Sequence, residues 1–120
     1  MEDFVNFEIA KKLKEKGFRE KCLRHYYPKS KDLFLSYAPD CENFSRYVDA
    51  PTISQVLLWL RKEKDIYISV FIDDETNNPV TYEIYKGTEC VCSHQGEYFT
   101  LGDWSKCESR AIEYALDNLI

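Results

Sequence analysis

The sequence predicts an α+β fold, with three helices and an antiparallel sheet of about five strands in the order α-β-β-α-β-β-β-α. Three segments repeat their apolar residues with helical spacing, and shorter segments between them alternate apolar and polar residues as half-buried strands do. The helices are separated along the chain from runs of consecutive strands, which is typical of the α+β class. A length of 120 residues fits a single domain over residues 1–120.

The first helix is expected to run from Phe4 to Lys16. Its apolar residues share one wide face and its charged residues occupy the other. Gly17 follows directly, at the position where helices commonly end with a residue in the left-handed conformation. Phe18 then takes the position whose apolar side chain packs back onto Leu13 in a Schellman motif.

Two short strands around a polar turn are expected next. The first lies within residues 22–27 and the second within residues 33–37, where apolar residues alternate with polar ones. Residues 38–50 contain many turn-forming residues and show no clear period, so they are expected to form a loop.

The second helix is expected to begin after Thr52 and to end near Lys64. Thr52 and Gln55 have the spacing of a capping box, in which each side chain bonds the backbone N–H of the other residue. Apolar residues cover much of this helix's circumference, which predicts that it is covered on more than one side.

The strongest strand signal in the chain runs from Ile66 to Ile72. The polar residues 73–79 predict a turn, and the alternating segment 80–85 predicts a second strand that pairs back as a hairpin. A further strand is expected within residues 88–101, either over 98–101 or over part of 88–92.

The last helix is predicted by a second capping-box pair, Ser105 and Glu108. Apolar residues then recur with the spacing of a helix face that packs on a core. They are Ala111, Ile112, Ala115, Leu116 and Leu119.

Charge is distributed unevenly along the chain. Residues 1–50 contain ten Lys or Arg and nine Asp or Glu, whereas residues 51–120 contain six and twelve. The acidic half disfavours polyanion binding there, because phosphate contacts need clustered cations. No apolar run approaches the ~20 residues that cross a bilayer, and the acidic start of the chain lacks the pattern of a secretory signal. We therefore expect a cytoplasmic protein whose five cysteines are free thiols.

Three blocks of sequence occur in order at residues 5–18, 50–61 and 111–120. They read VNFEIAKKLKEKGF, APTISQVLLWLR and AIEYALDNLI. Together they resemble a set of small bacterial proteins of unknown function that are encoded in prophages and other mobile elements. The resemblance implies a cytoplasmic accessory protein, and it brings no activity and no catalytic residue with it. The middle region, residues 86–104, departs from the set.

From the second helix onward, the expected order α-β-β-β-α is similar to that of the double-stranded-RNA-binding domain. That domain opens its last helix with a Ser- and Lys-rich signature that faces phosphates. Ser105, Lys106 and Arg110 suit the signature, whereas Cys107 and Glu108 break it. RNA binding by this acidic segment is disfavoured, because duplex recognition depends on phosphate and 2′-hydroxyl contacts.

Cys90, Cys92 and His94 have the residue types of a metal site. Alternate residues on a straight strand lie ~6.6 Å apart, whereas zinc requires all its ligands within ~2.0–2.3 Å of the ion. A site would need a bulge at Cys92 and a further ligand such as His25 or Cys22. We therefore expect no metal and no other cofactor.

Cys107, near the start of the last helix, is the best-placed candidate nucleophile. Asp103 and Glu108 are expected to disfavour its thiolate, although a nucleophilic cysteine needs that form. The chain also has no phosphate-binding loop and no hydrolase or metalloprotease motif. The sequence therefore favours a non-enzymatic protein and assigns no catalytic residue; a small enzyme with an unrecognised site is the third alternative.

The most suggestive surface is segment 19–31, where five Lys or Arg and one Glu are interleaved with aromatic residues. Such a mixture suits a protein-binding surface, because Tyr and Arg are enriched at interface anchors. It also suits single-stranded nucleic acid, which stacks its bases on aromatic rings. A third interpretation is an edge hairpin whose Lys and Pro prevent aggregation.

We expect an accessory protein that acts through contacts with an unidentified protein partner. Weak nucleic-acid binding through segment 19–31 is the alternative, and no membrane contact is expected. The candidate binding residues are Arg24, His25, Tyr26, Tyr27 and Lys29.

Overall fold

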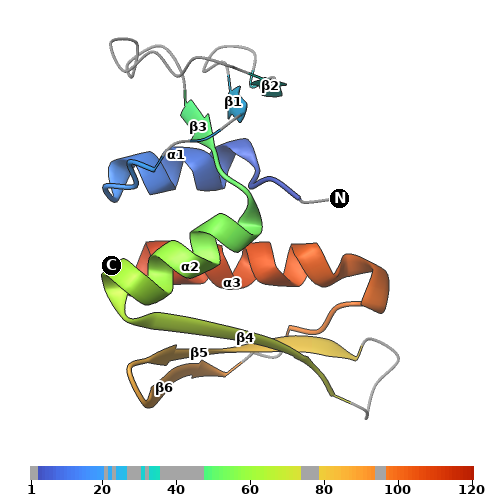
Figure 1. Ribbon diagram of the computed structural model, residues 1–120. Coiled ribbons are helices and arrows are strands. Elements are labelled where there is room, and N and C mark those ends of the chain that lie inside the picture. Colours follow the sequence, from blue (N-terminus) through green and yellow to red (C-terminus); the bar gives the residue numbers. More distant parts are fainter. Residues whose placement is uncertain are drawn as a thin grey trace. The chain divides into compact units, whose positions relative to one another are not determined.

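The computed structural model describes residues 3–20, 22, 24–26, 31, 33–35, 48–73, 79–93 and 97–120. The fold belongs to the α+β class, with three α-helices and antiparallel sheets, as the sequence predicts (Figure 1). The chain divides into two compact units, residues 1–52 (the N-terminal unit) and residues 53–120 (the C-terminal unit). The expectation of one domain over the whole chain stays a prediction.

The N-terminal unit contains one helix and one three-stranded sheet. The elements are α1 (Phe7–Glu15), β1 (Arg24–Tyr26), β2 (Leu33–Leu35) and β3 (Val48–Ala50). The sheet order is β2-β1-β3, both pairs are antiparallel, and α1 packs on β3. The expectation of a loop over residues 38–50 is wrong at β3. This strand has no local pattern of its own and exists because it pairs with β1.

Local interactions fix both ends of α1. The side chain of Asn6 caps its start by accepting a hydrogen bond of 2.9 Å from the backbone N–H of Ile9. The helix therefore begins at Phe7 rather than at Phe4. At its other end the backbone N–H of Phe18 donates to the carbonyl of Leu13 over 3.0 Å.

Gly17 makes the predicted Schellman motif possible. Its φ of +95° lies in the left-handed region, where a Cβ atom meets the following carbonyl oxygen. The backbone N–H of Gly17 donates to the carbonyl of Lys14 over 3.3 Å, which completes the second bond of the motif. The predicted end of the helix is thus confirmed.

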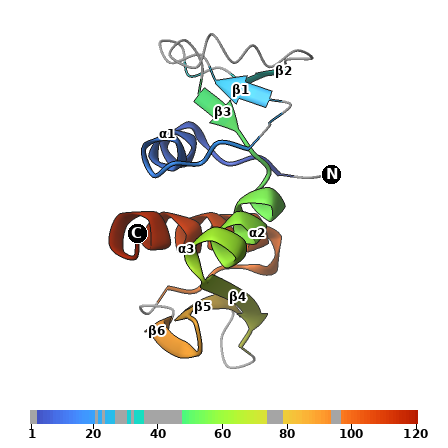
Figure 2. The ribbon, with the colours of Figure 1, turned by 60° about the vertical axis from the view of Figure 1, so that its left-hand side comes forward.

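The C-terminal unit packs two helices on one face of a second three-stranded sheet, as Figures 1 and 2 show. The elements are α2 (Ile53–Lys64), β4 (Ile66–Ile72), β5 (Val80–Lys86), β6 (Glu89–Ser93), the short 3₁₀ helix η2 (Leu101–Asp103) and α3 (Trp104–Asn118). The sheet order is β4-β5-β6, with antiparallel pairs throughout. The helix α2 packs on β4, whereas α3 packs on both β4 and β5.

The core of the C-terminal unit lies between this sheet and its helices. The predicted stripe on α3 is buried at Ala111, Ile112, Ala115 and Leu116, each of which is 0% exposed. The strand β5 faces these residues with Ile84, which is also fully buried. Burial of apolar area on this scale is the main stabilising contribution available to a unit of this size.

One sequence expectation for the C-terminal unit needs correction, and one alternative is decided. The helix α3 begins at Trp104 after Asp103, which makes no side-chain capping bond, so Ser105 is not its N-cap. Of the two alternatives within residues 88–101, the strand is β6, and Phe99 contributes only an isolated bridge to Val80. The sheet expected to be continuous is also divided into two.

The described part of the chain contains no helix that is long and apolar enough to cross a membrane. The longest described helix, α3, has fifteen residues and carries charged side chains, whereas a membrane span needs ~20 mostly apolar residues.

We predict that Gly17→Ala lowers the free energy of unfolding by about 1 kcal/mol, because alanine is disfavoured at positive φ. A Cβ atom at Gly17 would meet nothing within 4 Å, so the effect should come from the backbone alone. Gly102→Ala is the matched control, since a Cβ there has its nearest contact at 4.0 Å and no positive φ. Urea denaturation followed by circular dichroism measures both; equal stability of the two variants would contradict the explanation.

Candidate functional site

The central position of β1 limits what the predicted binding segment can do. The strand pairs with β2 on one side and with β3 on the other, so its backbone groups are used within the sheet. The hairpin of β1 and β2 lies at one edge of this sheet through β2, so its interpretation as a protective edge hairpin stays a prediction. Tyr27 and Lys29 lie outside the described residues, which leaves Arg24, His25 and Tyr26 to be placed.

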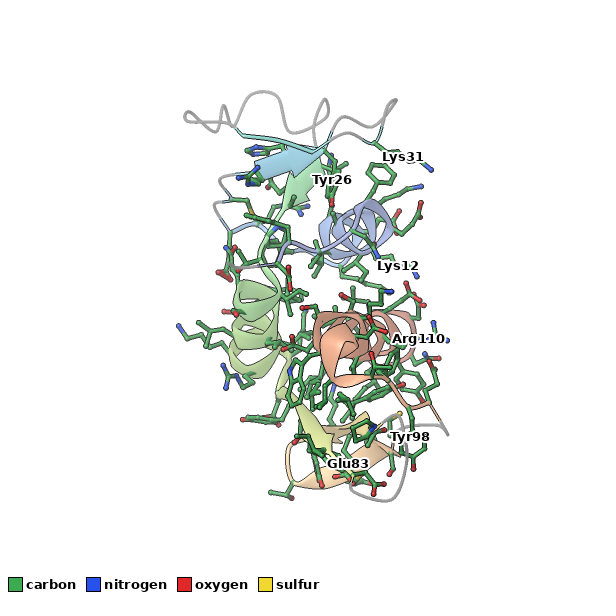
Figure 3. The ribbon with its side chains drawn as sticks, turned by 90° about the vertical axis from the view of Figure 1, so that its right-hand side faces the viewer. Lys12, Tyr26, Lys31, Glu83, Tyr98 and Arg110 are labelled. Carbon is green, nitrogen blue, oxygen red and sulfur yellow. The ribbon has the colours of Figure 1, made fainter. Side chains whose placement is uncertain are left out.

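Tyr26 packs against the helix instead of presenting a free ring. Its hydroxyl donates a hydrogen bond of 2.6 Å to the carbonyl of Val5. Its ring meets that of Phe7 edge-on, with the centroids 5.8 Å apart and the planes at 83°. Figure 3 shows this side chain extending from β1 towards α1. Partial burial raises the pKa of the Tyr26 hydroxyl above its ordinary value.

Arg24 also contacts an aromatic side chain within the N-terminal unit. The carbon at the centre of its guanidinium group lies 4.9 Å from the centroid of the Phe4 ring, the geometry of a cation–π contact. Phe4 in turn forms an isolated β-bridge to Thr52. Arg24 therefore helps to hold the start of the chain against the sheet.

His25 and Asp49 form a buried link between two strands. They are direct partners in the register of β1 and β3, and His25 Nε2 lies 2.9 Å from Asp49 Oδ1. The imidazole is only 5% exposed. Burial raises the pKa of the Asp49 carboxyl, and the neighbouring charges of His25, Lys14 and Arg19 partly oppose that effect. This pair stabilises the sheet and is not presented to a ligand.

The thiols of Cys22 and Cys107 both have a pKa above the ordinary value. Burial raises the pKa of Cys22 to about 12, and the charges of Asp49 and Glu20 add to the effect. Burial likewise raises the pKa of Cys107 to about 12, with further contributions from Glu108 and Glu97. An activated cysteine needs the opposite shift.

Cys90 and Cys92 differ in their surroundings. Cys90 is exposed, whereas Cys92 is buried, and the register with β5 shifts between Ile84 and Tyr85 beside them. His94 lies outside the described residues. Within the residues that the structure does describe, no group of three or more His, Cys, Asp or Glu is placed to hold a metal ion.

We predict that alkylation separates the described cysteines by accessibility. At pH 8, Cys90 should react first, whereas Cys22 and Cys107 should react roughly a thousand-fold more slowly than a thiol of ordinary pKa 9.0. Iodoacetamide labelling with peptide mass spectrometry measures the rates, and repeating it in denaturant should remove the difference. Rapid native labelling of Cys107 would contradict the assignment.

The described residues of the N-terminal unit form a groove of about 760 Å³ beside α1. Ligand-binding clefts in proteins commonly have volumes of this order. Basic side chains outnumber acidic ones around it, and one aromatic ring and one aliphatic side chain complete it. The groove residues are Phe7, Glu8, Lys11, Lys14, Glu15, Arg19, Lys31 and Val48.

Lys31 and Arg19 are held in place at the groove. Lys31 Nζ lies 3.7 Å from Glu8 Oε1 and 5.4 Å from the centroid of the Phe7 ring. Arg19 Nη1 donates to the carbonyls of Lys14 and Phe18 over 3.0 and 2.9 Å. A guanidinium has five N–H donors in a rigid fork, so these two bonds orient the group while other donors stay available to an anion.

Sequence reasoning found part of this groove and missed the rest. Arg19 and Lys31 belong to segment 19–31, which the sequence singled out. The contribution of α1 was missed, although Phe7, Lys11 and Lys14 have the spacing i, i+4 and i+7 of a single helix face. Their combination with Lys31 depends on tertiary packing, which no local pattern reveals.

The cations of the RNA-binding signature are engaged by neighbouring carboxylates. Lys106 Nζ lies 3.6 Å from Asp103 Oδ1. Arg110 donates from Nε to Glu97 and from Nη1 to Glu113, each over 3.0 Å. The hydrogen bond to Glu97 is the main cause of the raised pKa of Arg110. Both cations therefore lie beside negative charge, which weakens their attraction for phosphate.

The sequence matches no family model, no curated protein and no solved structure. The candidate site is therefore defined by the groove and its charges.

We predict that Tyr26→Phe lowers the free energy of unfolding by about 1 kcal/mol, because the buried carbonyl of Val5 loses its hydrogen bond. Tyr85→Phe is the matched control, since the hydroxyl of Tyr85 donates to the side chain of Glu83 over 2.7 Å. A carboxylate side chain can turn towards water, so the control should change stability by less than half as much. Chemical denaturation measures both, and a larger loss in the control would contradict the role assigned to Tyr26.

Proposed function

We propose that the protein is a non-enzymatic cytoplasmic accessory protein of a bacterial mobile element, and that it acts by binding a protein partner. Its resemblance to proteins of prophages and mobile elements supports the cellular setting. The groove beside α1 supports the mode of action and carries the proposal. The segment of the partner that binds in this groove is an acidic peptide that contains an apolar side chain.

The charges around the groove favour a ligand of this kind. The groove has four basic and two acidic side chains, so it attracts negative charge. Phe7 and Val48 provide an apolar surface between these charges. A peptide with both carboxylates and an apolar side chain can satisfy both parts of the lining, as charged rims and apolar centres do at protein interfaces.

Two observations favour a protein ligand over a nucleic acid. Binding of single strands depends on rings that are available for stacking, whereas Tyr26 and Phe7 contact each other and Phe4 is covered by Arg24. The carboxylates of Glu8 and Glu15 also line the groove and would repel phosphates. A flexible peptide can avoid these carboxylates, because its charges are not spaced regularly.

We predict that Lys11→Glu combined with Lys31→Glu weakens binding of an acidic peptide about tenfold. Each exposed charge contact contributes on the order of 0.2–1 kcal/mol, and 1.4 kcal/mol corresponds to a factor of ten. Fluorescence anisotropy with a labelled glutamate-rich peptide that contains leucine measures the affinity. A labelled single-stranded DNA of equal charge, measured in parallel, tests the nucleic-acid alternative.

The matched control is Lys62→Glu combined with Lys106→Glu. These two lysines are exposed on α2 and α3, and the variant has the same net charge as the groove variant. The control should bind the peptide as the wild type does. Equal weakening in both variants, or tighter binding of the DNA than of the peptide, would overturn the proposal.

A pull-down from cells extends this test to the natural partner. The wild type and the control variant should capture the same protein after nuclease treatment, and the groove variant should lose it. Material that disappears from the wild type on nuclease treatment would favour the nucleic-acid alternative instead.

A further inference from the structure

The two edges of the sheet in the C-terminal unit differ in how well they are protected against pairing with another strand. Natural sheets protect exposed edges with short strands, charged residues, proline or bulges. The edge strand β6 has five residues, begins with Glu89 and lies beside an irregularity in its pairing with β5. The opposite edge strand, β4, has seven residues and contains no charge, glycine or proline.

The hydrogen bonds at the two ends of β4 fix the direction of its backbone groups. The backbone N–H of Gly87 donates to the carbonyl of Asp65, and that of Asp73 donates to the carbonyl of Pro79. The register between β4 and β5 has no shift, so the odd-numbered residues of β4 bond to β5. Its even-numbered residues direct their N–H and C=O groups outward. In the part of the chain that the structure describes, no strand pairs with that outer edge.

The sequence of β4 is complementary to itself when two copies run antiparallel about a two-fold axis at Ser69. The outward groups of the four even-numbered residues then form about eight hydrogen bonds between the copies. Ile66 lies opposite Ile72 of the second copy, and Tyr67 lies opposite Phe71. Apolar and aromatic cross-strand pairs of this kind stabilise sheets.

Exposed apolar side chains occur on β4 and on the helix α2, which packs on it. Four large apolar side chains are exposed among the described residues, and three of them belong to α2 or β4. They are Leu58, Tyr67 and Ile72, with exposed fractions of 44%, 41% and 53%. Tyr67 and Ile72 point to opposite faces of β4, so this edge strand exposes apolar side chains on both faces. Exposed apolar residues on an unpaired edge strand favour pairing with another strand.

We propose that β4 pairs with β4 of a second copy of this chain, so that two three-stranded sheets form one sheet of six strands. A second copy is favoured over an unrelated strand because this register places every apolar or aromatic residue of β4 opposite another one, with Ile68 opposite Val70. At each end of the pairing, Asp65 of one copy lies near Asp73 of the other. Their repulsion limits the pairing to β4 and should be weakened by salt.

Sedimentation velocity on the full chain tests the association. The wild type should show a monomer–dimer equilibrium between ~1 and ~200 µM, and the dimer fraction should not decrease as salt is raised. Ser69→Lys should raise the dissociation constant at least tenfold, because the two lysines would face each other. Ser93→Lys, an equally exposed serine on β6, should leave it unchanged.

A cross-linking experiment tests the register. Residue 69 of the two copies would form a non-hydrogen-bonded pair with Cα atoms ~4.5 Å apart, within the ~4.4–6.8 Å range of disulfides. Ser69→Cys in a Cys90→Ser background should therefore form a covalent dimer with diamide, whereas Ser93→Cys in the same background should not. Circular dichroism verifies that each variant is folded.

Three results would overturn the proposal. They are a wild type that stays monomeric at ~200 µM, a dimer that Ser69→Lys leaves unchanged, and equal cross-linking at residues 69 and 93. The proposal does not rest on the groove of the N-terminal unit. The variant with Lys11→Glu and Lys31→Glu should dimerise as the wild type does, so failure of one proposal is distinguishable from failure of the other.

Discussion

The pairing of β1 on both of its sides is the constraint on which the candidate site depends. A central strand has no backbone groups left for a ligand, so only its side chains could take part in binding. Those side chains are committed as well: His25 bonds Asp49 on the neighbouring strand, and Tyr26 bonds the carbonyl of Val5. His25 and Tyr26 therefore make contacts within the unit, Tyr27 and Lys29 lie outside the described residues, and the proposed binding surface is placed on the helix α1 beside this strand.

The two proposed interactions should respond differently to salt, because the groove has mostly basic side chains and the ends of β4 have acidic ones. Four basic side chains line the groove of the N-terminal unit, and salt would weaken their proposed attraction for an acidic peptide by screening it. The edge of the C-terminal unit is uncharged along β4 and has an aspartate beyond each end, so salt reduces a repulsion there. Raising the salt concentration should therefore weaken the proposed peptide binding and favour the proposed pairing of β4. The first interaction depends on charge attraction and the second on apolar contact.

Local patterns predicted most of the fold, and contacts between distant residues account for the remainder. Gly17, Thr52 and the run from Ile66 to Ile72 specify their elements through neighbouring residues, and each was located correctly. The strand β3 was missed because its alternation of buried and partly exposed residues covers only three residues, and it forms by pairing with β1. The start of α3 was misplaced because a capping-box pattern does not reveal the 3₁₀ turn before it. The sequence singled out Arg19 and Lys31 of the groove and missed its residues on α1 and β3, because these segments come together only in the folded unit.

Packing against the helices of the C-terminal unit accounts for only half of the apolar residues in β4. Ile66, Ile68 and Val70 share the face that α2 and α3 cover, and any core would require apolar residues there. The core places no such requirement on Tyr67 and Phe71, which occupy the opposite face. On the same face of β5, Tyr67 is paired with Tyr85, Ser69 with Glu83, and Phe71 with Thr81, which is fully buried. Aromatic residues thus occur on this face of both strands, and what distinguishes β4 is its position at the edge of the sheet, with outward backbone groups that no described strand pairs.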